Sequence, residues 1–154
     1  MDVTMINPIL EAFVSIVPQL GFQTVEKKGI SLKGSILTYQ GVLINIGVVG
    51  PLKGAVLIGM ELDSAKQFAS KMMMGMEVPE LDSLAQSAIS EMGNMVCANA
   101  CTNFAKAGID GLDISPPTLL IGNDGQVRLA VSEVLVVNLT VDGIPVNVYC
   151  GLYK

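Results

Sequence analysis

Three polar side chains, Ser87, Glu91 and Asn94, recur four and three residues apart in an otherwise apolar stretch. An α-helix turns by about 100° per residue, so this spacing places them on one narrow side of a helix, called here the polar stripe. Small residues lie around Glu91 and Asn94: Ser87, Ser90, Ala98 and Cys101. Another macromolecule could therefore approach the carboxylate and the carboxamide closely.

The opposite side of the same stretch has the pattern of a buried helix face. Its apolar residues follow the spacing i, i+4, i+7 and i+11, which is typical of a helix packed on a core: Ala85, Ile89, Met92 and Val96. We expect this long helix to begin near Glu80 or Asp82 and to end at about Lys106, before Gly108.

The residue types limit the chemistry that the chain can perform. The sequence has no histidine, which removes histidine general bases, phosphohistidine intermediates and nearly every catalytic zinc site. Cys97 and Cys101 lie four residues apart but have too few partner ligands to hold a metal, and we expect them to be small buried side chains. Any chemistry must use carboxylate, amide, hydroxyl or thiol groups.

Charge and hydropathy exclude two classes of partner. The net charge is −5 and Lys and Arg do not cluster, so we expect no nucleic-acid binding. Residues 34–52 are uncharged, but polar residues, glycines and Pro51 interrupt them, and these interruptions indicate strand ends and turns rather than a membrane span. Three cysteines and an N-terminus without a basic, apolar leader predict free thiols and a cytoplasmic location.

The remaining segments predict an α+β fold in a single domain, residues 1–154. A helix over residues 6–17 comes first, followed by a short strand and a three-stranded antiparallel meander over residues 31–39, 42–49 and 52–60. A helix over residues 64–74 precedes the long helix. Later strands are expected at residues 118–122, 127–141 and 144–152, with hairpin turns at Asn123-Asp124-Gly125 and Asp142-Gly143. We expect one mainly antiparallel sheet, covered by helices, made of two half-units.

Ser115-Pro116-Pro117 interrupts this pattern, because proline fixes its own φ and disfavours helix at the residue before it. We predict a rigid, extended joint there, with Pro117 setting the entry into the next strand. Asn99 and Asn103 continue the long helix near its buried side, where we expect them to bond to the sheet or to loop backbone.

The pattern Ser87-x-x-x-Glu91-x-x-Asn94, followed after twenty-two residues by Pro117, resembles the signature of the CheC/CheX/FliY chemotaxis phosphatases. The run over residues 80–94 and the run over residues 114–118 are similar to the CheX branch in particular. CheC-type members carry two copies of the Glu-x-x-Asn site, whereas this sequence has one, which also favours the CheX type.

The resemblance implies a hydrolase of two-component signalling that removes the aspartyl phosphate of a CheY-like receiver domain. It also implies a homodimer joined by sheet pairing. We expect no cofactor or metal on this chain, because the Mg²⁺ would belong to the receiver.

The roles of the site residues follow from phosphoryl-transfer chemistry. Asn94 would orient the attacking water without adding negative charge, and Glu91 would bind the lysine beside the receiver's phosphoryl site. The substrate-binding surface would comprise Glu91, Ser87, Ser90 and Ala98. Ser87 either clears space or contacts water, and the steric role is favoured.

Other interpretations remain for this sequence. The same helix could serve a non-catalytic adaptor that only binds receivers, or the fold could serve assembly, as in flagellar switch components. The methionines at residues 72–76 could contact a partner, although methionines at a helix end more often fill gaps in a core.

Overall fold

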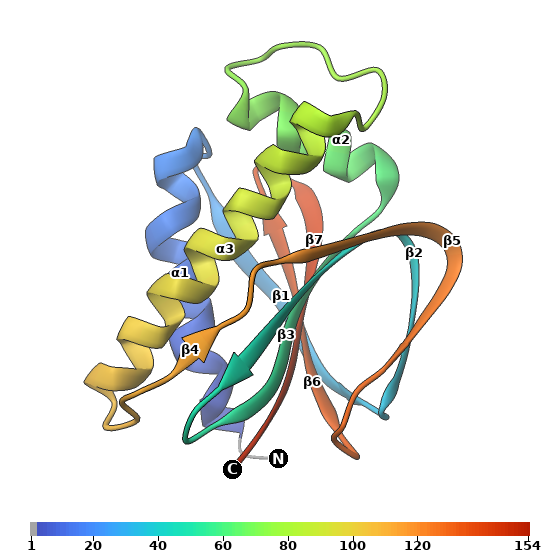
Figure 1. Ribbon diagram of the computed structural model, residues 1–154. Coiled ribbons are helices and arrows are strands. Elements are labelled where there is room, and N and C mark those ends of the chain that lie inside the picture. Colours follow the sequence, from blue (N-terminus) through green and yellow to red (C-terminus); the bar gives the residue numbers. More distant parts are fainter. Residues whose placement is uncertain (1–2) are drawn as a thin grey trace.

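The computed structural model describes residues 3–154 and contains one sheet with helices on one side (Figure 1). Residues 1 and 2 belong to the N-terminus considered above and lie outside the described residues. The helical elements are η1 (Val3–Ile6), α1 (Asn7–Ile16), η2 (Val17–Leu20), α2 (Leu62–Met72) and α3 (Ser83–Lys106). The strands are β1 (Val25–Lys33), β2 (Ile36–Val49), β3 (Lys53–Met60), β4 (Asp113–Ile114), β5 (Thr118–Arg128), β6 (Val134–Val141) and β7 (Ile144–Tyr153).

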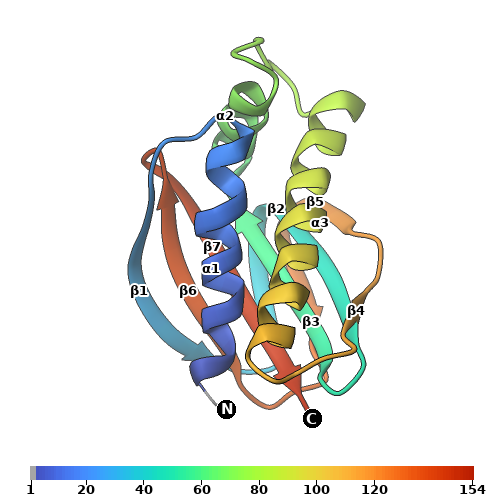
Figure 2. The same ribbon diagram turned by 90° about the vertical axis from the view of Figure 1, so that its left-hand side faces the viewer.

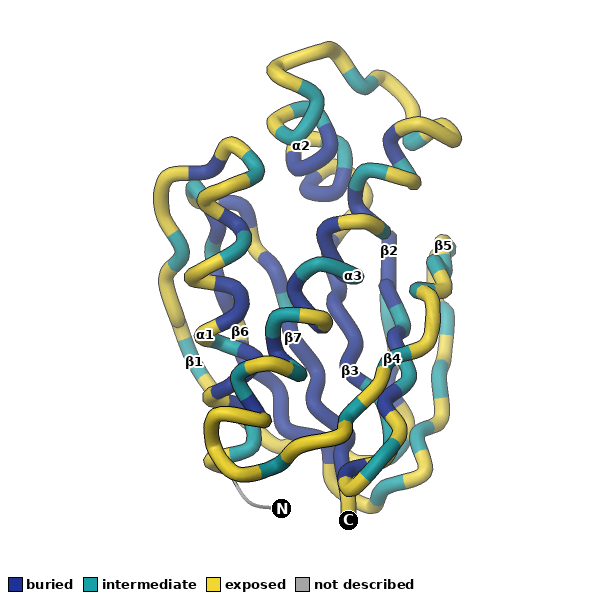
Figure 3. Tube along the Cα trace, turned by 60° about the vertical axis from the view of Figure 1, so that its left-hand side comes forward, coloured by how far each residue is buried: buried dark blue, intermediate teal, exposed yellow. Residues whose placement is uncertain are grey.

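The sheet has the order β1-β6-β7-β3-β2, and β4 and β5 both pair with the free side of β2. Every pairing is antiparallel, so the predicted fold class is confirmed. Helices α1 and α3 lie side by side across one face of the sheet, and α2 lies near one end of it (Figure 2). The strands are buried where these helices cover them (Figure 3).

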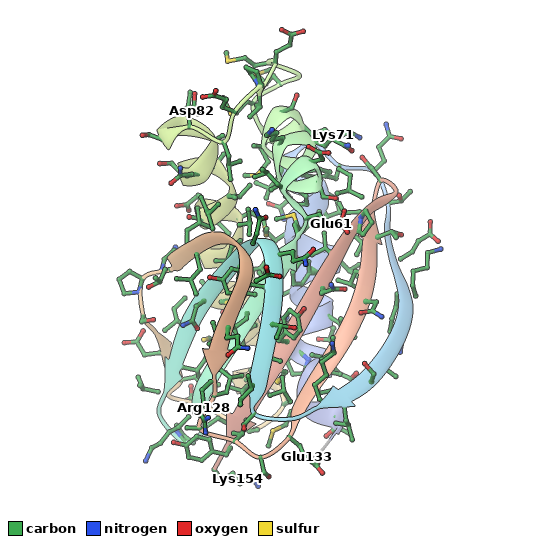
Figure 4. The ribbon with its side chains drawn as sticks, turned by 90° about the vertical axis from the view of Figure 1, so that its right-hand side faces the viewer. Glu61, Lys71, Asp82, Arg128, Glu133 and Lys154 are labelled. Carbon is green, nitrogen blue, oxygen red and sulfur yellow. The ribbon has the colours of Figure 1, made fainter. Side chains whose placement is uncertain are left out.

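The hydrophobic residues form two clusters, one on each face of the sheet. The larger cluster lies between the helices and the sheet and includes Phe13, Phe68 and Ile89. The smaller one lies on the other face and consists of Leu37, Leu43, Leu57, Val134, Val136 and Tyr149. Three of the charged residues labelled in Figure 4, Arg128, Glu133 and Lys154, lie at the opposite end of the molecule from Asp82.

The predicted three-stranded meander is wrong in two respects. Residues 36–49 form one long strand with an irregularity between Tyr39 and Gly41, and β1 pairs with β6 instead of β2. The turn that was expected near Gly41 is therefore absent, and the irregularity is a bulge in the facing strand β5, where Asn123 and Asp124 lie opposite Gln40.

The hairpin predicted at Asn123-Asp124-Gly125 is also wrong, because β5 continues through it. Gly125 lies opposite Tyr39, and a Cβ on Gly125 would come within 2.1 Å of the Tyr39 ring. The glycine thus makes room for an aromatic ring on the facing strand. The hairpin at Asp142-Gly143 is confirmed, with both residues at positive φ as a two-residue hairpin requires.

Helix α3 begins and packs as its sequence pattern predicts. Asp82 caps it, since its side chain accepts a hydrogen bond of 2.9 Å from the amide of Ala85. The predicted buried face, Ala85, Ile89, Met92 and Val96, is fully buried. Asn103 bonds to neither a sheet nor a loop: its amide donates to the carbonyl of Pro8 in α1, at 3.0 Å, and so ties the two helices together.

Candidate functional site

The polar stripe of α3 forms one wall of an open cleft of about 540 Å³. The opposite wall is the segment that links β4 to β5. The residues lining the cleft are Ser87, Ser90, Glu91, Asn94, Ile114, Ser115, Pro116 and Pro117. The structure therefore brings the helix motif and the Ser-Pro-Pro joint together, although more than twenty residues separate them in sequence.

The Ser-Pro-Pro wall is an interruption in the ladder between β2 and its partner. Ile114 pairs with Val48, and pairing resumes only where Thr118 meets Asn45. Prolines lack the amide hydrogen that a regular ladder needs, so residues 116 and 117 leave the sheet. Because their φ angles are fixed, this wall is rigid.

Ser115 anchors the wall to β2 by two hydrogen bonds. Its amide donates to the carbonyl of Gly47, and its Oγ accepts from the amide of Gly47, both at 2.9 Å. A Cβ on Gly47 would lie 3.1 Å from that Oγ, so the absence of a side chain there allows the close approach.

The same stretch of β2 also positions α3. A Cβ added to Gly93 would lie 3.0 Å from Cγ2 of Ile44 and 3.3 Å from Cδ1 of Ile46, so the helix packs closely against the sheet one residue before Asn94. Both walls of the cleft therefore rest on residues 44–47 of β2, and this shared support fixes the distance between them.

The two candidate functional side chains have no partner inside the chain. Glu91 is exposed and Asn94 is half-buried. Within residues 3–154, neither side chain makes a hydrogen bond or an ion pair. Their polar atoms face solvent and are available to another molecule.

The remaining predicted residues are arranged around this pair. Ser87 is exposed and Ser90 is half-buried, and both line the cleft. Ala98 is exposed but lies outside the lining, two helical turns beyond Glu91. Ile114, Ser115 and Pro116 line the cleft without having been predicted as site residues. Their signal was the run over residues 114–118, which resembles CheX, although the Ser-Pro-Pro part of it was interpreted as a structural joint.

Glu91 is the single ionisable group among the residues that line the cleft. A carboxylate without a neighbouring cation attracts a positively charged group and repels a free phosphate. The cleft is thus suited to a partner that brings its own cation.

The cysteines of α3 and β7 supply no nucleophile. Burial raises the pKa of Cys97 and of Cys150 to about 12, so both thiols stay protonated at neutral pH. Cys101 is half-buried, and burial, with the nearby Asp113 carboxylate, raises its pKa as well. None of the serines that line the cleft is hydrogen-bonded to a carboxylate or another base in the part of the chain that the structure describes, so none is activated as a nucleophile.

Comparison with known proteins agrees with this geometry. The family model described as chemotaxis phosphatase CheX matches residues 42–140. The CheY-P phosphatase CheX of Thermotoga maritima is 30% identical over 129 residues, which cover 83% of this chain and 82% of that protein.

Solved structures extend the likeness to the whole fold. A CheC-like superfamily protein from Shewanella matches with a TM-score of 0.86 and 20% identity over all of both chains. The CheX-CheY-BeF3-Mg²⁺ complex from Borrelia burgdorferi matches with a TM-score of 0.78 and 25% identity, covering 97% of this chain and 98% of that one. The sequence and structural matches together show that the chain belongs to the CheX family of chemotaxis phosphatases.

Proposed function

We propose that this protein hydrolyses the aspartyl phosphate of a CheY-type receiver domain in chemotactic signalling. The observation that carries the proposal is the pairing of Glu91 and Asn94, both without internal partners, on a helix face that looks onto a rigid wall. The T. maritima relative is a CheY-P phosphatase, and the B. burgdorferi relative was solved with CheY, BeF3 and Mg²⁺.

Asn94 is proposed to orient the attacking water. A carboxamide both donates and accepts hydrogen bonds, so it can hold a water in line with the phosphorus atom without adding charge. Because an acyl phosphate is already reactive, alignment suffices: a hundredfold acceleration requires only about 2.7 kcal/mol.

Glu91 is proposed to bind the lysine beside the receiver's phosphorylated aspartate. A carboxylate directed at the phosphoryl oxygens would be repelled, whereas a lysine ammonium is attracted. Mg²⁺ is assigned to the receiver, because one carboxylate offers too few oxygens for a magnesium site on this side.

The small side chains are proposed to allow the close approach. Ser87 and Ser90 line the cleft, and Ala98 extends the same face beyond Glu91. None projects far enough to hold a partner helix or loop away from Asn94. Pro116 and Pro117 limit the approach from the other side.

Two further proposals concern the assembly and its location. We propose that residues 1–154 act as one domain and that two copies join through a sheet edge, since β1 pairs on one side only and exposes Ile30 and Leu32. Light scattering that gave a monomer mass would remove the dimer.

No helix of the described chain is long and apolar enough to cross a membrane. We place the protein in the cytoplasm because its three cysteines are free and the proposed partner belongs to chemotaxis signalling.

The test is the decay of a phosphorylated CheY receiver labelled with ³²P. We expect the wild-type chain to accelerate loss of label and Asn94→Ala to return it to the receiver's own rate. Asn123→Ala, an exposed asparagine on β5, is the matched control and should behave as wild type. A wild-type chain that leaves the decay unchanged would instead support the adaptor or assembly interpretation.

A further inference from the structure

The polar stripe continues in the N-terminal direction into an exposed leucine. Leu84 precedes Glu91 by seven residues, which places the two within about 20° of the same side of α3 and about 10 Å apart along its axis. The side chain of Leu84 is 60% exposed. Of all the residues of α3, every one of which the structure describes, it is the one exposed large hydrophobic residue.

Folding does not account for the position of Leu84. The core-facing residues Ala85 and Ile89, both fully buried, lie about 100° and about 140° around the helix from Leu84. Asp82 already caps the helix, so Leu84 has no part in its start. A single exposed leucine is ordinary on a protein surface; its alignment with Glu91 is what distinguishes this one.

Apolar side chains also flank Glu91 along the helix, in addition to its polar neighbours Ser87 and Asn94. Leu84 lies two turns before it, the half-buried Met95 lies one turn after it, and the exposed Ala98 follows two turns after it. A partner that covers these residues removes water from around the carboxylate, and an ion pair is stronger in the lower dielectric that results.

Resting on the proposed function, we propose that Leu84 is the apolar anchor of the receiver interface. The receivers that this chain accepts would present an apolar side chain about 10 Å from the lysine that pairs with Glu91. The occupant of this surface is thus the same receiver domain that presents its phosphoryl group to Asn94, because Leu84 and the cleft residues lie on one continuous helix face.

The structure offers a set of variants that change one property at a time. Leu84→Ala removes the apolar bulk, Leu84→Gln replaces it with a polar side chain of similar size, and Leu84→Met keeps it apolar. All three residues are good helix formers, so helix stability is preserved. Leu62→Ala is the matched control, a leucine that is 40% exposed in the first turn of α2.

The measurement is steady-state dephosphorylation of a CheY receiver, together with titration of the same receiver charged with Mg²⁺ and BeF3⁻. We expect Leu84→Ala and Leu84→Gln to raise KM and the dissociation constant about tenfold with kcat unchanged, as for a moderate interface hot spot. Leu84→Met and Leu62→Ala should stay within about threefold of wild type.

The outcomes separate this inference from the proposed function. An active wild type with unchanged KM in Leu84→Ala and Leu84→Gln would overturn the anchor and leave the phosphatase intact. A lower kcat without a change in KM would also overturn it. A wild type that neither binds nor dephosphorylates the receiver would remove both proposals.

Discussion

Asp142 and Glu91 are both acidic residues, one in a hairpin turn and one in the long helix α3, but the chain treats them in opposite ways. Asp142, in the β6–β7 turn, accepts hydrogen bonds from the amides of Gln23 and Thr24 and from Lys71 of α2. Glu91 receives no such bond from any residue that the structure describes. The first carboxylate stabilises the fold, and the second is free to bind a partner.

The hydrogen bonds of these two carboxylates separate a structural acidic residue from one that is available to a partner. The bond from Lys71 and those from Thr24 and Gln23 hold the pKa of Asp142 well below its usual value of 3.8, which is the mark of a carboxylate already satisfied in the folded state. Glu91 and Asn94 line one cleft and have no hydrogen-bond partner within the described chain, so they are available to bind another molecule.

Reversing the charge at Glu91 tests the binding side of this comparison and should have the largest effect. Glu91→Lys would place a positive charge opposite the receiver's lysine. We therefore expect KM to rise at least about a hundredfold, while the free energy of unfolding stays unchanged. Glu91→Gln should raise KM about tenfold and reduce its dependence on salt, because the screened ion pair is gone. Glu11→Lys on α1 controls for net charge; an equal effect there would contradict the assigned contact.

Neutralising Asp142 tests the stability side. We expect Asp142→Asn to lower the melting temperature at pH 7 by a few degrees, with kcat unchanged. Asp124→Asn is the matched control, an aspartate that also has positive φ but has one hydrogen bond of 3.5 Å. It should melt as wild type does.

The pH dependence of the stability difference between wild type and Asp142→Asn tests the same network. The pKa of Asp142 is lowered by folding, so its contribution is fully present above about pH 4 and is lost as pH falls toward the folded value. The stability difference between wild type and Asp142→Asn should therefore narrow below pH 4 in chemical denaturation. A gap that stays constant down to pH 2 would contradict the assigned network.

Loosening the Ser-Pro-Pro wall should have the smallest effect. Ser115→Ala removes the hydrogen bond from the amide of Gly47 and should cost about 1 kcal/mol of unfolding free energy. We expect kcat to fall severalfold at most, because the prolines keep their own φ. Ser132→Ala, an exposed serine, should change neither quantity.

Local sequence signals predicted the helix that carries the site but not the cleft as a whole. Asp82 and the spacing of Ala85, Ile89, Met92 and Val96 are properties of neighbouring residues, so they fixed the start and the buried face of α3. The polar stripe follows from that same periodicity. These features need no knowledge of the rest of the chain.

The errors arose where distant pairing decides the local structure. Asn123-Asp124-Gly125 has the composition of a hairpin turn, but β2 lies beside it and extends β5 through it, with Tyr39 over Gly125. The second wall of the cleft depends on Ser115 bonding to Gly47, 68 residues away. No sequence pattern within either segment predicts the contact between Ser115 and Gly47.

The most direct test separates the roles of Glu91 and Asn94 by concentration. A CheY receiver labelled with ³²P is mixed with increasing amounts of each variant until the decay rate saturates. We predict that Glu91→Ala regains the wild-type rate at high concentration, whereas Asn94→Ala binds with wild-type affinity and never exceeds the receiver's own decay. Saturation of Asn94→Ala at the wild-type rate would contradict the central claim that this amide orients the attacking water.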